Sequence, residues 1–207
     1  LKDILESMYC TEEAIVHVGH RSVTPLMLAC QYSIEAVKLL IGTGYYTEER
    51  LKFVNRTDET CLAIACKYLP EAVDIILSSP NCTASVLNYS SIYGATAFLI
   101  AVEHSAEATE YIMTSKYFRH QTFNAKYEDG TTALHLACNF NIEVVPLLLN
   151  HKYCTPDYLK MRDKNGLTAL MFLVKSYPKL IYMFLDHPKF VINILNIPDS
   201  DYLTTPL

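Results

Sequence analysis

A threonine followed two residues later by a large apolar residue recurs along this chain at a constant interval. Each of its five copies starts 36 residues after the one before, at Thr24, Thr60, Thr96, Thr132 and Thr168. The fullest copy reads Thr132-Ala133-Leu134-His135-Leu136-Ala137-Cys138. A fixed period of about 20–50 residues is typical of solenoids and propellers, in which each repeat is one supersecondary unit. The repeat therefore constrains the fold more than any other feature of the sequence.

Each copy predicts a short helix that is followed at once by a second helix. A threonine caps a helix by accepting a hydrogen bond from an early backbone N–H. Pro25 suits the first helical position, because the missing proline N–H is not needed there. Apolar residues recur at helical spacing in the second helix, as in residues 33–40. Pro146 falls inside one of these second helices, where we expect it to kink or loosen the helix, at a cost of up to about 3 kcal/mol.

A third, single-turn helix is expected in the segment before each following threonine. Thr155 followed by Pro156 is a strong signal of a helix start. Thr47 and Thr83 open similar segments, and in one copy we place His120 where the threonine stands elsewhere. The last copy, residues 189–193, is rich in β-branched residues and is expected to be extended instead.

These motifs resemble the ankyrin repeat. The resemblance rests on the Thr-x-Leu-x-x-Ala helix, the Val-x-x-Leu-Leu helix, and a glycine two residues before the threonine, at Gly94, Gly130 and Gly166. It implies an all-α solenoid of stacked helix pairs with short β-hairpin fingers, to which this chain adds a short helical turn per repeat. It also implies that His135 is a structural residue, bonded to the helix cap and across the turn. The period exceeds the family's usual value of about 33 residues. In this respect the chain is similar to the long ankyrin arrays of giant DNA viruses.

The period divides residues 1–207 as a single ankyrin-repeat array. We expect the end of a truncated repeat at 1–19, the start of another at 200–207, and full repeats at 20–55, 56–91, 92–127, 128–163 and 164–199. Both ends look cut from a longer array. In the first junction, Val54-Asn55 matches the family's Val-Asn pair but lies only five residues before Thr60, where Leu87-Asn88 lies eight before Thr96. This predicts a first hairpin that is three residues shorter, with Asp58 in the place of the glycine.

Composition limits the classes of partner, the metal sites and the cellular compartment that the chain can have. Half of the 207 residues are hydrophobic (51%), so a continuous core is possible. The net charge of −5 and the lack of a basic run give no support for nucleic-acid binding. No apolar run reaches the roughly 20 residues of a membrane span. Seven cysteines are an odd number, and none has the spacing of a zinc site. We expect reduced, buried thiols and a cytoplasmic protein, in the host cytoplasm if it is viral.

Motifs for catalysis or cofactor binding are not found. The six glycines form no phosphate-binding loop, and no nucleophile–base set is visible. We therefore predict no enzyme activity, no catalytic, metal or cofactor site, and no small-molecule substrate. The expected function is protein–protein interaction, as a scaffold or adaptor, and for a viral protein the partner would be a host protein. The alternatives are a regulatory or anchoring segment of a larger enzyme or channel, and a structural spacer.

Candidate partner-binding residues lie in columns of equivalent positions. The resemblance implies a concave groove, formed by the hairpin tips and the first helices, that binds other proteins. Three columns vary while the framework repeats: His20, Arg56, Ile92, Glu128 and Lys164; then Arg21, Thr57, Tyr93, Asp129 and Asn165; then Val23, Glu59, Ala95, Thr131 and Leu167. The alternative is that these are simply exposed loops that tolerate change.

A fourth column ends the first helices and is mostly aromatic. It consists of Tyr32, Tyr68, His104 and Phe140. Such rings are favoured anchors of protein interfaces. They could equally cover the short turn between the two helices.

Overall fold

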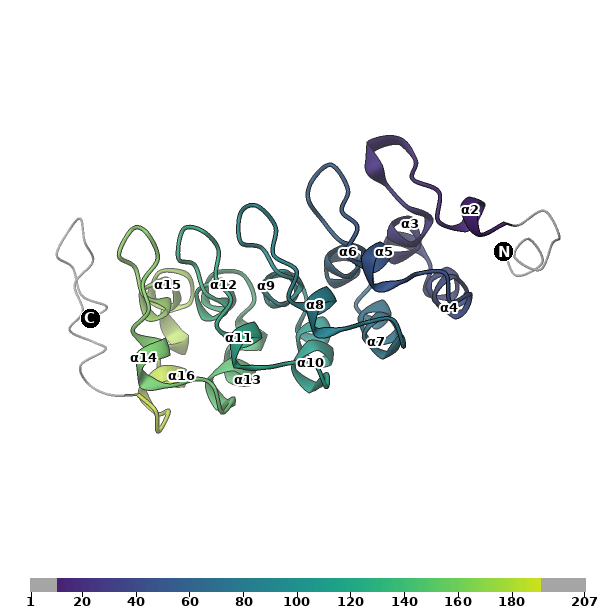
Figure 1. The fold of residues 1–207 in the computed structure, drawn as a ribbon. Coiled ribbons are helices and arrows are strands. Elements are labelled where there is room, and N and C mark those ends of the chain that lie inside the picture. Colours follow the sequence, from purple (N-terminus) through teal and green to yellow (C-terminus); the bar gives the residue numbers. More distant parts are fainter. Residues whose placement is uncertain (1–10, 191–207) are drawn as a thin grey trace.

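A computed structural model describes residues 11–190, and these residues form an elongated array of helices (Figure 1). Each repeat contributes a finger-like loop, a first helix, a second helix and a short helix, in that order. The first helices stand side by side in one row: α3 (Pro25–Tyr32), α6 (Cys61–Tyr68), α9 (Ala97–His104), α12 (Ala133–Phe140) and α15 (Ala169–Ser176). The second helices form a parallel row: α4 (Ile34–Gly42), α7 (Glu71–Ser78), α10 (Ala106–Thr114), α13 (Val145–Asn150) and α16 (Tyr182–Leu185).

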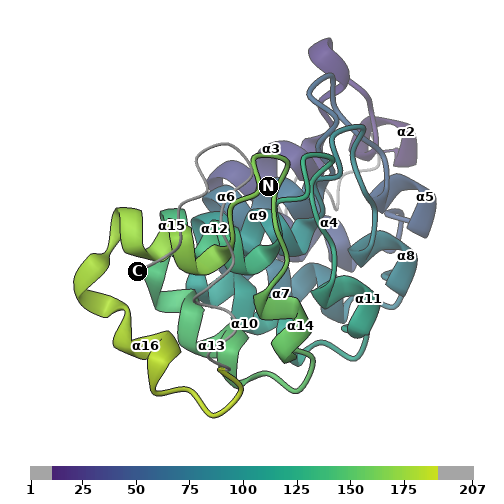
Figure 2. The same cartoon turned by 90° about the vertical axis from the view of Figure 1, so that its left-hand side faces the viewer.

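The expected third helix is present in each junction that the structure describes. These single turns form a further row: α2 (Glu12–Ile15), α5 (Glu48–Leu51), α8 (Ala84–Leu87), α11 (His120–Phe123) and α14 (Pro156–Leu159) (Figure 2). The remaining helical turns are of the 3₁₀ type: η1 (His20–Ser22), η2 (Ile142–Val144) and η3 (Pro178–Leu180). Residues 1–10 and 191–207 lie outside the described part, so the extended form expected near 189–193 falls mostly outside it.

The threonines cap the first helices as predicted. Thr24 Oγ1 accepts the N–H of Met27 at 3.2 Å, and Thr60, Thr96 and Thr168 make the same contact three residues ahead. Each such cap contributes about 1 kcal/mol and fixes where the helix begins. The recurring threonine therefore sets the register of the whole array.

The core is a line of apolar side chains that runs through successive repeats. One position of each first helix is completely buried, at Leu26, Leu62, Phe98, Leu134 and Leu170. Each first helix packs against the first helix of the next repeat. Burial of such a side chain contributes about 1.5–3 kcal/mol. A repeat therefore shields its apolar side against its neighbours, which is the physical basis of a solenoid.

The described cysteines confirm the expectation of buried thiols. Cys30, Cys61, Cys66, Cys82, Cys138 and Cys154 are all free and buried. Burial raises the pKa of the Cys82 thiol to about 11, so the unreactive neutral form dominates near pH 7. These side chains act as small apolar core residues.

The prediction of a shorter first hairpin is wrong. Asn55 donates its N–H to the carbonyl of Glu59 at 3.1 Å and accepts the N–H of Asp58 at 3.0 Å. The same two bonds are made 36, 72 and 108 residues further on, by Ser91, Tyr127 and Asp163. Asn55 therefore stands in the fingertip, and Leu51 takes the place that Leu87 has in the next repeat. Val54-Asn55 resembles the family's pair by residue type alone.

The placement of His120 at the threonine position is also wrong. Arg119 precedes α11 in register with Thr47, Thr83 and Thr155. The cap is inverted, because Thr122 Oγ1 accepts the N–H of Arg119 at 3.3 Å. The short helix thus forms without a threonine at its start.

Pro146 loosens the start of its helix. The segment opens as the 3₁₀ turn η2, and α13 follows with Pro146 in its first turn. A proline there lacks an N–H that the helix does not use. The helix is therefore shortened and not kinked in its interior.

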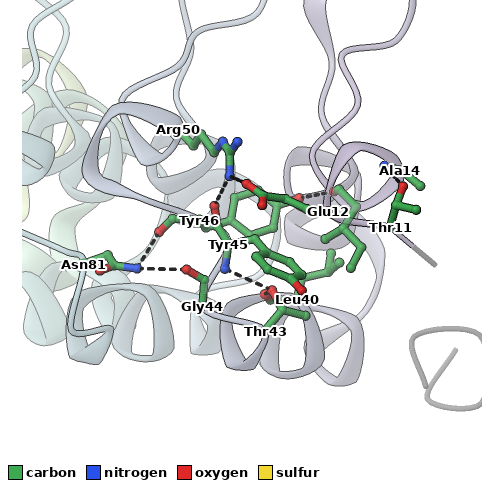
Figure 3. A network of polar contacts seen from close by, with 11 residues as sticks. Thr11, Glu12, Ala14, Leu40, Thr43, Gly44, Tyr45, Tyr46, Arg50 and Asn81 are labelled. Carbon is green, nitrogen blue, oxygen red and sulfur yellow. Dashed lines mark hydrogen bonds and ion pairs between the residues drawn. The ribbon is translucent and has the colours of Figure 1, made fainter. Parts of the chain in front are cut away.

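Polar contacts of the short helices tie neighbouring repeats together. The buried Tyr46 donates its hydroxyl to the carbonyl of Ile15 at 2.9 Å and accepts the N–H of Leu26 at 3.2 Å. Asn81 donates to the carbonyl of Tyr46 at 3.1 Å, and Arg50 pairs with Glu12 at 2.6 Å (Figure 3). One tyrosine thus joins segments of three successive repeats.

Candidate protein-binding surface

The fingers are held side by side by their own backbones. The N–H of Arg56 donates to the carbonyl of Arg21 at 3.1 Å, and the N–H of Glu128 to that of Tyr93 at 3.0 Å. Lys164 and Asp129 make the same bond at 2.6 Å. The three later fingers each close on their own base through a single antiparallel bridge, as between Ser90 and Thr96. The fingertips therefore form one ordered edge along the array (Figures 1 and 2).

Asp58 occupies a position where the later fingers have glycine, as predicted. Its φ of 60° is in the left-handed region, like those of Gly94, Gly130 and Gly166. The Asp58 carboxylate accepts the N–H of Ile92 at 2.6 Å and the hydroxyl of Tyr89 at 2.7 Å. Strain in one finger is thus offset by two contacts to the next one.

The structure brings the first two predicted columns together on the fingertip edge. Every member of the first is exposed: His20, Arg56, Ile92, Glu128 and Lys164. In the second, Asp129 is half-buried and the others are exposed: Arg21, Thr57, Tyr93 and Asn165. The third column, which includes Glu59 and Leu167, is half-buried at the base of the fingers. The backbone carbonyl of each residue in this column accepts the N–H of the residue four positions earlier, and this hydrogen bond closes the finger. The third column is therefore partly structural.

The aromatic column is strongly exposed. Tyr32 is 80% exposed, Tyr68 59% and Phe140 56%, and His104 is exposed as well. The rings of Tyr32, Tyr68 and Phe140 present apolar surface at the ends of α3, α6 and α12. A run of exposed apolar rings is a feature of interaction surfaces.

Between the fingers and the first helices the surface is hollowed. One hollow of about 460 Å³ is lined by Glu103, Tyr127, Asp129, Phe140 and Phe172, among others. A second of about 270 Å³ shares Glu103 and Tyr127 with it and includes Lys67 and Tyr93. Sequence reasoning missed Lys67, Glu103 and Asn139. The signal was available, since these residues stand one position before the aromatic column in successive repeats.

Charged groups in these hollows are partly paired. Lys67 forms an ion pair with Glu59 across the second hollow. Burial, and then the nearby Glu103 carboxylate, raise the pKa of Tyr127 to about 12. Burial also opposes the charge of Asp129, but hydrogen bonds from Thr131 outweigh it and lower the pKa of Asp129. Asp129 is therefore ionised at neutral pH.

His135 is a structural residue, as the resemblance implied. Its Nδ1 accepts the N–H of Thr132 at 3.2 Å, and its Nε2 lies 3.1 Å from the carbonyl of Leu167. These partners require a proton on Nε2 and none on Nδ1, so the ring is neutral. Burial lowers the pKa of His135 and favours that state. The ring links the cap of α12 to the base of the next finger.

Within residues 11–190, groups of three or more histidine, cysteine or acidic side chains arranged to hold a metal ion are not found. The helices of that same part are all too short or too polar to cross a membrane.

Comparison with known proteins agrees with this geometry. Residues 98–196 match the family model for ankyrin repeats in three copies. The structure is similar to the ankyrin repeat domain of Bcl-3, a member of the IkappaB protein family, with a TM-score of 0.68 and 23% sequence identity over 90% of this chain and 79% of that one. No curated protein matches the chain. Residues 98–196 therefore have the sequence of ankyrin repeats, and the described part of the chain is an all-α ankyrin solenoid.

A second similar structure is the predatory endopeptidase Bd0816 from Bdellovibrio bacteriovorus in complex with the immunity protein Bd3460. A chain of that complex has a TM-score of 0.63 and 20% identity, with 86% of each chain covered. The likeness at this level of identity concerns the fold.

Proposed function

We propose that this chain is a non-catalytic protein-interaction module that binds its partner with the fingertip edge and the adjoining groove. Ankyrin repeats generally mediate protein–protein interaction. One observation carries the proposal: buried positions keep their character from repeat to repeat, whereas the exposed fingertip column changes from arginine to isoleucine to glutamate to lysine. A selective surface on a uniform scaffold has this pattern.

The order of the surface supports the proposal. The fingertips are fixed by hydrogen bonds from finger to finger, which join backbone groups in three cases and use the Asp58 side chain in the fourth. A partner therefore need not order them on binding, and this limits the entropic cost of association. Exposed rings at Tyr93 (66%) and Phe140 (56%) supply the apolar anchors that interfaces favour.

Affinity capture from a cell lysate, followed by mass spectrometry, tests the proposal. The chain is compared with a variant that carries Arg56→Ala, Tyr93→Ala and Lys164→Ala. A control variant carries Lys38→Ala, Tyr182→Ala and Lys179→Ala, which removes a tyrosine and two positive charges from exposed positions of the second helices and of η3.

We expect the control to retain partners that the groove variant loses. Equal recovery by all three proteins would contradict the assignment of the surface. A partner in the host cytoplasm would follow if the chain is viral, and that origin rests on the 36-residue period alone. The alternative, a regulatory or anchoring segment of a larger enzyme or channel, predicts a partner within the same polypeptide. Turnover of a substrate by this chain alone would contradict the non-catalytic assignment.

A further inference from the structure

We infer that the bound protein presents a segment with an arginine side chain, and that the hollow lined by α9, α12, α15 and the fingers before α12 and α15 receives its guanidinium group. This inference rests on the proposed function, because it names the chemistry of the partner at the same surface. It follows from the charge, the rings and the size of that hollow.

Negative charge prevails along this part of the groove. The two adjoining hollows are lined by a single lysine, Lys67, and by five carboxylates: Asp58, Glu59, Glu103, Asp129 and Asp163. A cationic group of the partner is therefore complementary to the floor of the groove.

Three of the five carboxylates are already used by the fold. Glu59 pairs with Lys67. Asp58 holds the next finger through Ile92 and Tyr89. Asp163 accepts backbone N–H groups of its own loop at 2.8 and 2.9 Å. These three groups have structural roles, so the remaining two are the ones that face a partner.

Glu103 and Asp129 flank the half-buried Tyr127 in the larger hollow. A carboxylate offers about four lone-pair positions for hydrogen bonds. Asp129 accepts the N–H of Thr131 through Oδ1 at 3.0 Å. The neighbouring Lys164 offsets part of the Asp129 charge, so Glu103 is the principal acceptor for an incoming cation.

Aromatic rings make arginine the best match among basic side chains. Phe140 is 56% exposed and lines the hollow together with Phe172 and Tyr127. A guanidinium group is planar, stacks on such rings, and can donate two parallel hydrogen bonds to one carboxylate. A lysine ammonium group can neither stack as a plane on a ring nor donate two parallel hydrogen bonds to one carboxylate. The hollow of about 460 Å³ is large enough for such a side chain.

Selection of random peptides displayed on phage provides a probe that needs no known partner. We expect the wild-type chain to enrich peptides with an arginine. A selected peptide should bind about tenfold more weakly to Glu103→Gln, which is about 1.4 kcal/mol at 25 °C. Glu110→Gln removes the same charge from an exposed position of α10, and it should leave the affinity unchanged.

A double-mutant cycle locates the contact. The arginine of the peptide is replaced by citrulline, which keeps its shape and removes its charge. If the guanidinium lies on Glu103, citrulline should weaken binding to wild type but should add little to the effect of Glu103→Gln.

The outcomes separate this inference from the proposed function. Enriched peptides without arginine, or equal effects of Glu103→Gln and Glu110→Gln, would overturn the inference while protein binding still stands. A selection that enriches nothing would also overturn it. Loss of partner capture by the groove variant is a separate measurement, and it decides the proposed function alone.

Discussion

Close approach of successive fingers makes Gly94 a position that no larger residue can fill without cost. A Cβ atom there would lie 2.8 Å from the carbonyl oxygen of Lys126 and 3.0 Å from the backbone nitrogen of Glu128. Both atoms belong to the backbone of the next finger, which cannot move aside as a flexible side chain would. Gly94→Ala is therefore expected to push two fingers apart as well as to strain the turn.

The magnitude follows from two contributions. Gly94 has a φ of 82°, and alanine in the left-handed region costs about 1–2 kcal/mol. Overpacking against a fixed neighbour adds about 1–3 kcal/mol. Since alanine also restricts the unfolded chain, which favours folding by about 0.4–1 kcal/mol, the net loss should be about 1–4.5 kcal/mol, with a central value of about 3 kcal/mol.

Gly44 supplies a matched control. Its φ of 75° is similar, but a Cβ atom there meets nothing within 4 Å. Gly44→Ala should therefore cost only about 1 kcal/mol, the conformational part of the effect. Urea unfolding followed by circular dichroism measures both free energies. Equal losses for the two variants would refute the reasoning that the fingers are in contact.

Three further predictions concern the core, the strained fingertip and the buried histidine. Leu134→Ala in the central rung should lower the free energy of unfolding by about 3 kcal/mol in the same urea assay. Asp58→Ala should destabilise by about 2 kcal/mol, because the bonds to Ile92 and Tyr89 are lost, and Asp58→Gly by about 1 kcal/mol less, because glycine relieves the positive φ. Burial depresses the pKa of His135, so the unfolded chain takes up that proton first and stability should fall as the pH drops through about 6.5. Urea unfolding at several pH values should show a smaller loss of unfolding free energy at low pH for His135→Gln than for the wild-type chain.

The features that the sequence predicted correctly are those that recur with the 36-residue period. The capping threonines at Thr24 and Thr96 mark helix starts by a bond to a residue only three positions away. The rungs at Leu26 and Phe98 are buried because each repeat must shield its apolar side in the same way. Features that depend on the period alone were therefore predictable from the order of residues.

Features that depart from the repeated residue types, or that depend on contacts between repeats, were not predictable. Residue type aligns Asn55 with Asn88, whereas the backbone bonds that define a fingertip join residues three and four apart and give no sequence motif. Thr122 caps the helix in place of a preceding threonine, and only the fold shows this. Glu103 came to matter through the hollow that it lines with Tyr127 and Phe140, two residues of the next repeat.

Hydrogen–deuterium exchange on the chain, with and without a partner obtained by affinity capture, tests the central claim most directly. The claim is that protein binding takes place on the fingertip edge and the groove. It predicts slower exchange in the fingers and in α6, α9 and α12 on binding, with α7, α10 and α13 unchanged. Protection confined to the second helices would contradict it.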